Sequence, residues 1–392
     1  MKMTKGLVGL GAVLALSLSL PAAGLGALAG VQDDRLAVTP LKDINARLNL
    51  IAKSGAKVTR VDLFWSEVAP TKPRNPDNPK DSAYKWQHED AIFTGLAKRK
   101  IIPIVTVFNT PAWAAGGKTG PVGGYNPNMP NVAQYARFMG AVAKRYSGTY
   151  KIGGRTLPQV RFFEVWNEPN LQLYMYPQWK GKKAVSIVNY AKLVRAAYPR
   201  IKKANPNAVV IAGVAGPKGK SNDTGVGSIP WLNGFIRQHA PFDAYSQHIY
   251  PAAGPRSKTK AKPSWNTIPL ILQTLDRVKK DIPLYITEAG YTTAPTDYRK
   301  VKVTLRQQST FLGQVFGLPQ VKSKRVPVVV WFNLQDNPNW PGGLIALSGH
   351  PKLALLSFRK VARGGLIPAE LQLPTTKPGK PGKAAKPAKR RG

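Results

Sequence analysis

The chain has 392 residues and contains no cysteine. Disulfide bonds, thiolate metal sites and thiol nucleophiles are therefore excluded. Histidine is rare as well, which leaves little scope for a metal cluster; the four are His88, His239, His248 and His350. We expect neither a metal nor a cofactor. Because 43% of the residues are hydrophobic, the chain can bury a large core, in one large domain or two ordinary ones.

Acidic residues are also scarce, since 19 Asp and Glu stand against 58 Lys and Arg, for a net charge of +39. Two lysines lie at the N-terminus and seven basic residues follow Leu373, so a net charge of +30 belongs to the body between them. A field of this sign attracts polyanions. In an exported protein these are anionic cell-wall polymers or acidic glycans, whereas nucleic acid is the cytoplasmic alternative. We expect no specific nucleic-acid partner, and a basic surface without any specific partner remains an alternative.

The N-terminus has the layout of a secretory signal peptide. Met1–Lys5 is short and basic, Gly6–Leu20 is an apolar run too short for a transmembrane helix, and small residues follow. We predict a signal peptide over residues 1–26, with its cleavage site between residues 22 and 29; a retained N-terminal anchor is the alternative. No later run is long enough to span a membrane. We therefore expect a secreted or cell-surface-associated protein.

The C-terminus repeats Lys-Pro-Gly and Lys-Pro units over residues 374–392. Such a composition cannot pack a core, so we predict a disordered basic tail. The folded domain is then expected over residues 27–373.

Apolar, strand-like runs recur at wide, regular intervals through this domain. They cover residues 27–34, 57–65, 101–109, 159–167, 208–213, 242–250, 282–290 and 326–333, of which the first is the weakest. Helical patterns fill several of the gaps. One places Leu41, Ile44, Leu48 and Ile51 on one face, and another places Val132, Tyr135, Met139, Val142 and Tyr146 on one face.

Strands that alternate with helices pair in parallel. Eight such units predict an α/β fold, a closed (β/α)8 (TIM) barrel with enlarged βα loops. An open doubly wound sheet is the alternative, but it would usually show a glycine-rich first turn, which is absent here. A barrel carries its chemistry at the carboxyl ends of its strands.

Two of the six glutamates in the chain stand at such strand ends. Glu168 follows one run, in Asn-Glu-Pro, and Glu288 closes another, in Thr-Glu-Ala-Gly. Paired carboxylates across a pocket suit glycoside hydrolysis, in which one protonates the leaving oxygen and the other attacks or activates water. Side chains alternate faces along a strand, and the more polar set at the strand ends also gathers Arg60, His248, Tyr250 and Trp331 around this site.

These motifs resemble those of retaining glycoside hydrolases of clan A, the barrels related to cellulases, xylanases and β-xylosidases. The resemblance rests on Asn167-Glu168-Pro169 after strand four, a glutamate on strand seven, an Arg on strand two, a His-x-Tyr on strand six and a Trp on strand eight. It covers roughly residues 30–370.

The resemblance implies a role for each residue. Glu168 is the general acid/base and Glu288 the nucleophile. Asn167 holds the sugar 2-hydroxyl, Tyr250 hydrogen-bonds the nucleophile, Arg60 keeps it ionised, and Trp331 forms a floor under the sugar ring.

The sequence departs from this pattern after strand three, where relatives often carry a histidine. Here Asn109 and Trp113 are the candidates for sugar contact. Glu164 lies one layer below Glu168, and we interpret it as a buried partner of Arg60 or of a lysine.

The alternatives to a secreted glycosidase acting on a carbohydrate are a catalytically idle, basic glycan-binding barrel and a structural polyanion-binding protein.

Overall fold

The computed structural model describes residues 26–122, 124–258, 263–297 and 299–364. The predicted basic tail, and all but the last residue of the predicted signal peptide, lie outside these ranges. Within them, no helix combines the length and the hydropathy that crossing a membrane requires.

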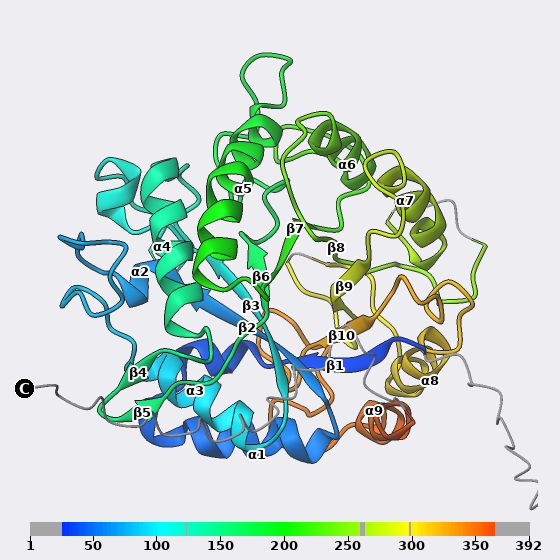
Figure 1. Ribbon diagram of the computed structural model, residues 1–392. Helices are drawn as coiled ribbons and strands as arrows, with labels where there is room; N and C mark the ends of the chain where they lie inside the picture. The colour runs from blue at the N-terminus through cyan, green and yellow to red at the C-terminus, as the bar shows by residue number, and fades with distance from the viewer. Residues whose placement is uncertain (1–25, 123, 259–262, 298, 365–392) are drawn as a thin grey trace, which may run out of the picture.

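Eight parallel strands close into a barrel in the order β1-β2-β3-β6-β7-β8-β9-β10 (Figure 1). They are β1 (Leu28–Gln32), β2 (Val58–Phe64), β3 (Ile102–Phe108), β6 (Phe162–Val165), β7 (Val209–Ala215), β8 (Ala244–Gln247), β9 (Leu284–Ala289) and β10 (Val328–Phe332). All eight predicted strands are confirmed, including the weak first one. β1 pairs with both β10 and β2, which excludes the open sheet.

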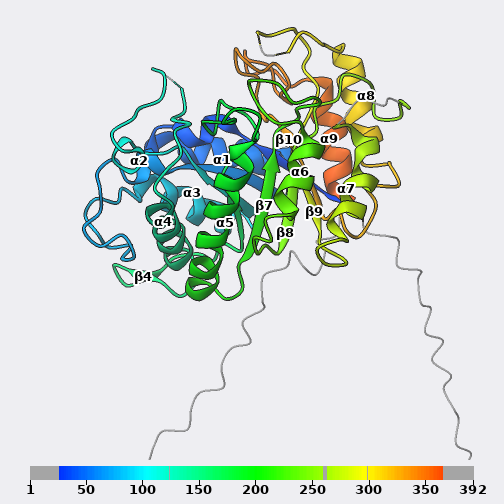
Figure 2. The ribbon, with the colours of Figure 1, turned by 90° about the horizontal axis from the view of Figure 1, so that it is seen from above.

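Helices surround the barrel, as Figures 1 and 2 show. They are α1 (Ile44–Ser54), α2 (Trp65–Val68), α3 (Gln87–Lys98), α4 (Val132–Arg145), α5 (Val185–Ala204), α6 (Ser228–Ile236), α7 (Ile268–Leu275), α8 (Leu305–Val315) and α9 (Leu353–Arg363). Both predicted helices are present. Gly55 ends α1 with a φ of 90°, a left-handed conformation that suits glycine. Leu41 was wrongly placed on the apolar face of α1, because it precedes the helix and is exposed.

The barrel has two apolar layers. The inner one fills the amino-terminal half of the lumen and includes Leu28, Val58, Phe162 and Val330; the outer one lies between strands and helices. Above the inner layer the inward side chains become polar, as with Arg60, Thr106 and Glu164, all buried. The amino end of the barrel is thus a packed core, and the polar chemistry is confined to the carboxyl end.

Long loops follow several strands at the carboxyl end. The loop after β6 (residues 166–184) and the loop after β7 (residues 216–227) bridge to each other at Leu171 and Gly225. The loop after β10 (residues 333–352) packs on the segment after β1, where Arg35 donates to the Asp336 carbonyl at 2.9 Å. A short hairpin, β4 (Lys151–Ile152) and β5 (Arg155–Thr156), lies outside the barrel sheet. The enlarged βα loops of the prediction are therefore present.

Candidate active site

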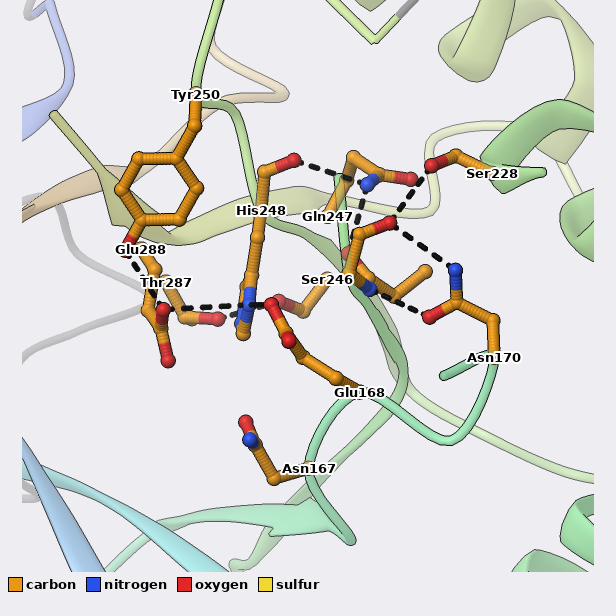
Figure 3. Close-up of polar contacts among 12 residues, drawn as sticks. Asn167, Glu168, Asn170, Ser228, Ser246, Gln247, His248, Tyr250, Thr287 and Glu288 are labelled. Atoms are coloured by element: carbon orange, nitrogen blue, oxygen red, sulfur yellow. Dashed lines mark hydrogen bonds and ion pairs between the residues drawn. The ribbon is translucent and has the colours of Figure 1, made fainter. Parts of the chain in front are cut away.

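The backbone turns sharply where β6 ends. Trp166 and Glu168 both have positive φ, 69° and 38°, a conformation that non-glycine residues adopt rarely and at some cost. The Glu168 amide donates to the Val214 carbonyl of β7 at 3.0 Å, which holds the turn. As a result, both Asn167 and Glu168 project into the barrel mouth (Figure 3). Trp166 instead packs outward on Tyr135 of α4.

Glu168 lies in a shielded environment. Its side chain is 10% exposed, and its Oε1 is 2.7 Å from Nδ1 of His248. Burial raises the pKa of Glu168 to about 7, with Arg60 acting more weakly in the other direction. The same burial lowers the pKa of His248 to about 4, so this imidazole is neutral at neutral pH. Glu168 can therefore hold a proton near neutrality, as a general acid must.

Glu288 is as shielded as Glu168 but has different partners. Arg60 Nη1 donates to its Oε1 at 2.7 Å, and the Tyr250 hydroxyl donates to its Oε2 at 2.7 Å. The net effect is a raised pKa of Glu288: burial and the charge of Glu168 raise it, whereas the His248 and Arg60 side chains and the Tyr250 hydroxyl act in the opposite direction. Because His248 is neutral at neutral pH, Arg60 is the cation that favours the ionised form of Glu288 there.

The two carboxylates lie close together across the mouth. One oxygen of each, together with a ring nitrogen of His248, falls within a 4.8 Å group. Carboxyl groups in retaining glycosidases are about 5–5.5 Å apart, and those in inverting enzymes about 6.5–9.5 Å apart. The same three groups could ligate a metal ion, but Arg60 already supplies positive charge at 2.7 Å from Glu288. That charge disfavours a divalent cation, and we assign none.

Arg60 connects the parts of the site. Its guanidinium is fully buried and donates to Glu164 at 2.6 Å, to Gln32 at 2.9 Å and to Asn167 at 2.7 Å, besides Glu288. Glu164 also accepts from Thr106 at 2.6 Å, and Arg60 helps to hold the pKa of this carboxyl below its usual range against the effect of burial. The interpretation of Glu164 as a buried partner of Arg60 is confirmed.

The prediction for Trp331 is wrong. Its side chain is completely buried in the outer layer, donates to the Gly342 carbonyl at 3.1 Å and packs near Tyr291. Val328 and Val330 fill the lumen, so alternation turns Trp331 outward. Its neighbour Phe332 instead lies toward the mouth, with its ring centroid 6.4 Å from that of Tyr250.

Alternation along β9 also fails to account for the orientation of Glu288, and the cause here is an irregularity in strand pairing. Leu284 and Ile286, which share its parity, lie in the outer layer, whereas Glu288 reaches the mouth. Pairing between β9 and β10 shifts register between Val329 and Trp331, and such an irregularity changes which side chains face inward.

Asn109 and Trp113 stabilise the loops that follow β2 and β3. Asn109 donates to Ser66 at 2.9 Å and accepts from the Asn126 amide at 2.7 Å. Trp113 donates to the Ala69 carbonyl at 2.8 Å and packs edge-on against Trp65. These contacts satisfy the polar groups of both residues within the loops, and no described contact links either side chain to Glu168 or Glu288.

Sequence reasoning missed an aromatic cluster beside the carboxylates, formed by Phe64, Phe108, Tyr125 and Tyr174, with neighbouring ring centroids 5.1–6.0 Å apart. Burial raises the pKa of the Tyr174 hydroxyl, and the nearby charge of Glu168 adds to this effect. Tyrosines in the segment after Glu168 were the available signal, but aromatic side chains in loops more often pack than bind.

Behind Glu168, Asn170 joins the ends of β6 and β7 (Figure 3). Its side chain accepts from the Gly216 amide at 2.6 Å and donates to the Gly216 carbonyl at 3.1 Å. A Cβ atom on Gly216 would lie 2.9 Å from Cδ of Glu168, so a residue without a side chain is required there. Asn170 was not predicted, although it stands in the same Asn-Glu-Pro-Asn motif.

A closed (β/α)8 barrel with two glutamates close together at the carboxyl ends of its strands is the arrangement expected of a clan A glycoside hydrolase. The family model for glycosyl hydrolases family 39 matches residues 35–308 of the chain. The chain therefore belongs to glycosyl hydrolases family 39.

Solved structures with the same fold include members of this family. A family 39 glycoside hydrolase from the gut symbiont Bacteroides cellulosilyticus WH2 is 21% identical, with a TM-score of 0.60 over 86% of this chain and 64% of that one. A monomeric beta-xylosidase from Caulobacter crescentus CB15 is 18% identical, with a TM-score of 0.60 over 86% of this chain and 68% of that one.

A glucosidase from Croceicoccus marinus is 14% identical, with a TM-score of 0.61 over 87% of this chain and 67% of that one. The chain thus spans about two thirds of the length of these proteins. No curated protein matches the sequence at a significant level.

Proposed function

We propose that the protein hydrolyses O-glycosidic bonds with retention of anomeric configuration, through a covalent glycosyl-enzyme. Glu288 attacks the anomeric carbon, while Glu168 protonates the leaving oxygen and then takes a proton from the incoming water. Asn167 accepts a hydrogen bond from the Arg60 guanidinium, which also contacts Glu288, and we expect Asn167 to hold the sugar 2-hydroxyl. One contrast carries the proposal: Arg60 and Tyr250 hydrogen-bond Glu288 and favour its ionised form against the effect of burial, whereas Glu168 contacts neutral His248 and burial raises its pKa to about 7.

The substrate class is proposed from relatives. Family members of this fold include a beta-xylosidase, and a glucosidase shares the barrel, so aryl β-xylosides and β-glucosides are the first compounds to test. A panel of aryl glycosides and polysaccharides would also test the alternative, a catalytically idle glycan-binding barrel. Binding without hydrolysis of any member of the panel would favour that alternative.

The roles of the two glutamates are tested by azide rescue. An activated aryl glycoside needs no protonation, so Glu168→Ala should still form the glycosyl-enzyme, which then accumulates as a burst because water lacks a base. Azide needs no base and should give a glycosyl azide with the anomeric configuration of the substrate, as determined by NMR. An azide of inverted configuration would contradict the double displacement. No rescue, with the wild type active, would remove Glu168 from the acid/base role.

We also propose that the protein is exported. The basic start and the apolar run up to Leu20 support this proposal. Fractionation of the producing cells, with N-terminal sequencing of the exported form, would test it; a form that stays in the cytoplasm would contradict it.

A further inference from the structure

The loops that follow β6 and β7 form one basic wall beside Glu168. We define the basic wall as residues 171–184 and 216–227. Besides the bridge between Leu171 and Gly225, the Trp179 indole donates to the Asn222 carbonyl at 2.9 Å and the Gln172 amide donates to the Thr224 carbonyl at 3.0 Å. The wall begins three residues after Glu168 on one side, and on the other at Gly216, which packs directly against the Glu168 carboxyl group.

The basic wall carries five lysines and a single acidic residue. The lysines are Lys180, Lys182, Lys183, Lys218 and Lys220, and the acidic residue is Asp223. On the side of β1 and β2, by contrast, Asp33 pairs with Arg47 at 2.5 Å and Asp62 with Arg60 at 3.3 Å. The excess of positive charge on the basic wall would therefore attract an anionic group to this side of the mouth.

Lys218 differs from the other lysines of the basic wall because it is only partly exposed. Three lysines among the described residues are not fully exposed, and two of them pair with an aspartate: Lys202 with Asp243 at 3.2 Å and Lys352 with Asp336 at 3.1 Å. Lys218 has no acidic partner among the described residues, and its ammonium donates to the Thr224 hydroxyl at 3.0 Å. Burial lowers the pKa of Lys218, which marks a cation that an anion would stabilise.

The position of Lys218 is fixed by its backbone. Its amide donates to the Gly216 carbonyl at 2.8 Å, and its own carbonyl accepts from the Ser228 amide at 2.7 Å. The side chain then crosses Gly225, where an added Cβ would lie 3.2 Å from Cδ of Lys218. The cation is thus held on the wall two residues from the glycine that backs Glu168.

A general acid contacts the oxygen of the leaving group, so the leaving group lies on the Glu168 side of the mouth. We propose that the basic wall binds an anionic group on the leaving-group side of the substrate, with Lys218 as its principal contact. The substrate class is then a saccharide that carries a carboxylate, sulfate or phosphate on the sugar beyond the scissile bond. The kinetic test of this inference rests on the proposed hydrolysis, whereas the binding test does not require it.

The kinetic test compares two glycosides of the same sugar, with 4-nitrophenyl and with 3-carboxy-4-nitrophenyl leaving groups. The measured quantity is the ratio of kcat/KM for the acidic substrate to that for the neutral one. Lys218→Met should lower this ratio about tenfold, as expected for the loss of one charge-assisted hydrogen bond. Lys218→Arg should keep it, and the ratio for the wild type should fall in about 1 M salt, where the screening length is about 3 Å.

The matched control is the double variant Lys279→Met, Lys280→Met. These exposed lysines precede β9 and so lie at the opposite, amino end of the barrel. If this control lowered the ratio as much as Lys218→Met does, the effect would come from overall charge, and the proposed role of the basic wall would be refuted. An unchanged ratio in Lys218→Met would refute that role directly.

The binding test needs no turnover. Glu288→Gln is titrated in a calorimeter with an oligouronate, with its carboxyl-reduced neutral counterpart and with a sulfated neutral oligosaccharide. We expect at least one acidic oligosaccharide to bind more tightly than the neutral one, and the added substitution Lys218→Met to weaken this binding about tenfold. Tighter binding of the oligouronate would identify a carboxylate as the recognised group, and tighter binding of the sulfated oligosaccharide would identify a sulfate. Equal binding of all three would overturn the inference. Absence of hydrolysis in the wild type, with this preference intact, would overturn only the proposed function.

Discussion

The surroundings of Glu168 and Glu288 differ although both carboxyl groups are nearly enclosed. Glu288 receives hydrogen bonds from a guanidinium and a phenol, whereas Glu168 contacts a neutral imidazole and packs against Gly216, directly after β7. Burial alone would protonate both groups. The difference lies in the hydrogen bonds from Arg60 and Tyr250, which Glu288 accepts directly, whereas Arg60 acts on Glu168 only through its charge. Two identical side chains thus have different electrostatic surroundings, as the proposed roles require.

The largest expected effect comes from removing the carboxylate on the Arg60 side. Glu288→Ala cannot form a covalent intermediate, so kcat should fall about 10⁵-fold or more on every substrate, including those with excellent leaving groups. Steady-state kinetics with an activated aryl glycoside provide the measurement. Substantial activity of Glu288→Ala on that substrate would mean that Glu288 is not the nucleophile.

The second effect weakens one hydrogen bond to Glu288. Tyr250→Phe removes the hydroxyl that donates at 2.7 Å, so the pKa of Glu288 should rise and the acidic limb of the kcat/KM profile should move to higher pH. We expect kcat/KM at neutral pH to fall about 10–100-fold. Tyr198→Phe is the matched control, because Tyr198 donates to Asp243 at 2.9 Å, far from the mouth. A lower kcat/KM without a shift of the acidic limb of its pH profile would mean that Tyr250 acts in substrate binding.

The third effect displaces Glu168 without changing its chemistry. A Cβ on Gly216 would lie 2.9 Å from Glu168 Cδ and 2.7 Å from Leu171 Cδ1, so Gly216→Ala must move the acid. We expect kcat/KM to fall about tenfold on a substrate with a poor leaving group and less on an activated one, since only the former needs protonation. Gly313→Ala is the control, because no atom lies within 4 Å of that added Cβ. Equal losses on both substrates would point to general damage to the fold.

The smallest effect is on stability. The pKa of Glu168 is about 7 in the folded protein against 4.5 for an ordinary glutamate, so the folded state binds this proton more tightly than the unfolded chain does. Ionisation therefore destabilises the fold increasingly from about pH 4.5 to 7, by about 3 kcal/mol at the upper end.

Glu168→Gln abolishes this penalty, and its gain in unfolding free energy over the wild type should be greater at pH 8 than at pH 4. Urea denaturation at the two pH values measures the difference. A gain that does not depend on pH would mean that Glu168 titrates normally.

Most of the barrel was predictable because each strand is a distinct apolar run with polar loops on both sides. The grouping of Glu168 and Glu288 with Arg60, His248 and Tyr250 at the mouth was also predictable, since each stands at or near a strand end. Trp331 was misplaced because alternation says that neighbours point apart but not which of them points inward. Only the packing of Val328 and Val330 in the lumen decides that question.

The remaining misses concern irregular backbone and loops. The register shift beside β9 and the positive φ of Trp166 and Glu168 have no local sequence signature, because tertiary contacts impose them. Lys218 and Gly216 belong to a loop whose position depends on its pairing with another loop, from Leu171 onward. Such contacts cannot be read from composition or periodicity.

The closure of the barrel also sets an order for its folding. The first strand pairs in register with the last, Leu28 with Val328, across an interval that spans nearly the whole described chain. This contact carries one of the largest loop-closure entropies in the molecule, and contacts of such separation slow folding. During synthesis β1 has no partner on that edge until β10 has been made. Neighbouring strands can therefore pair early, but β1 and β10 can pair only after the rest of the barrel has been synthesised.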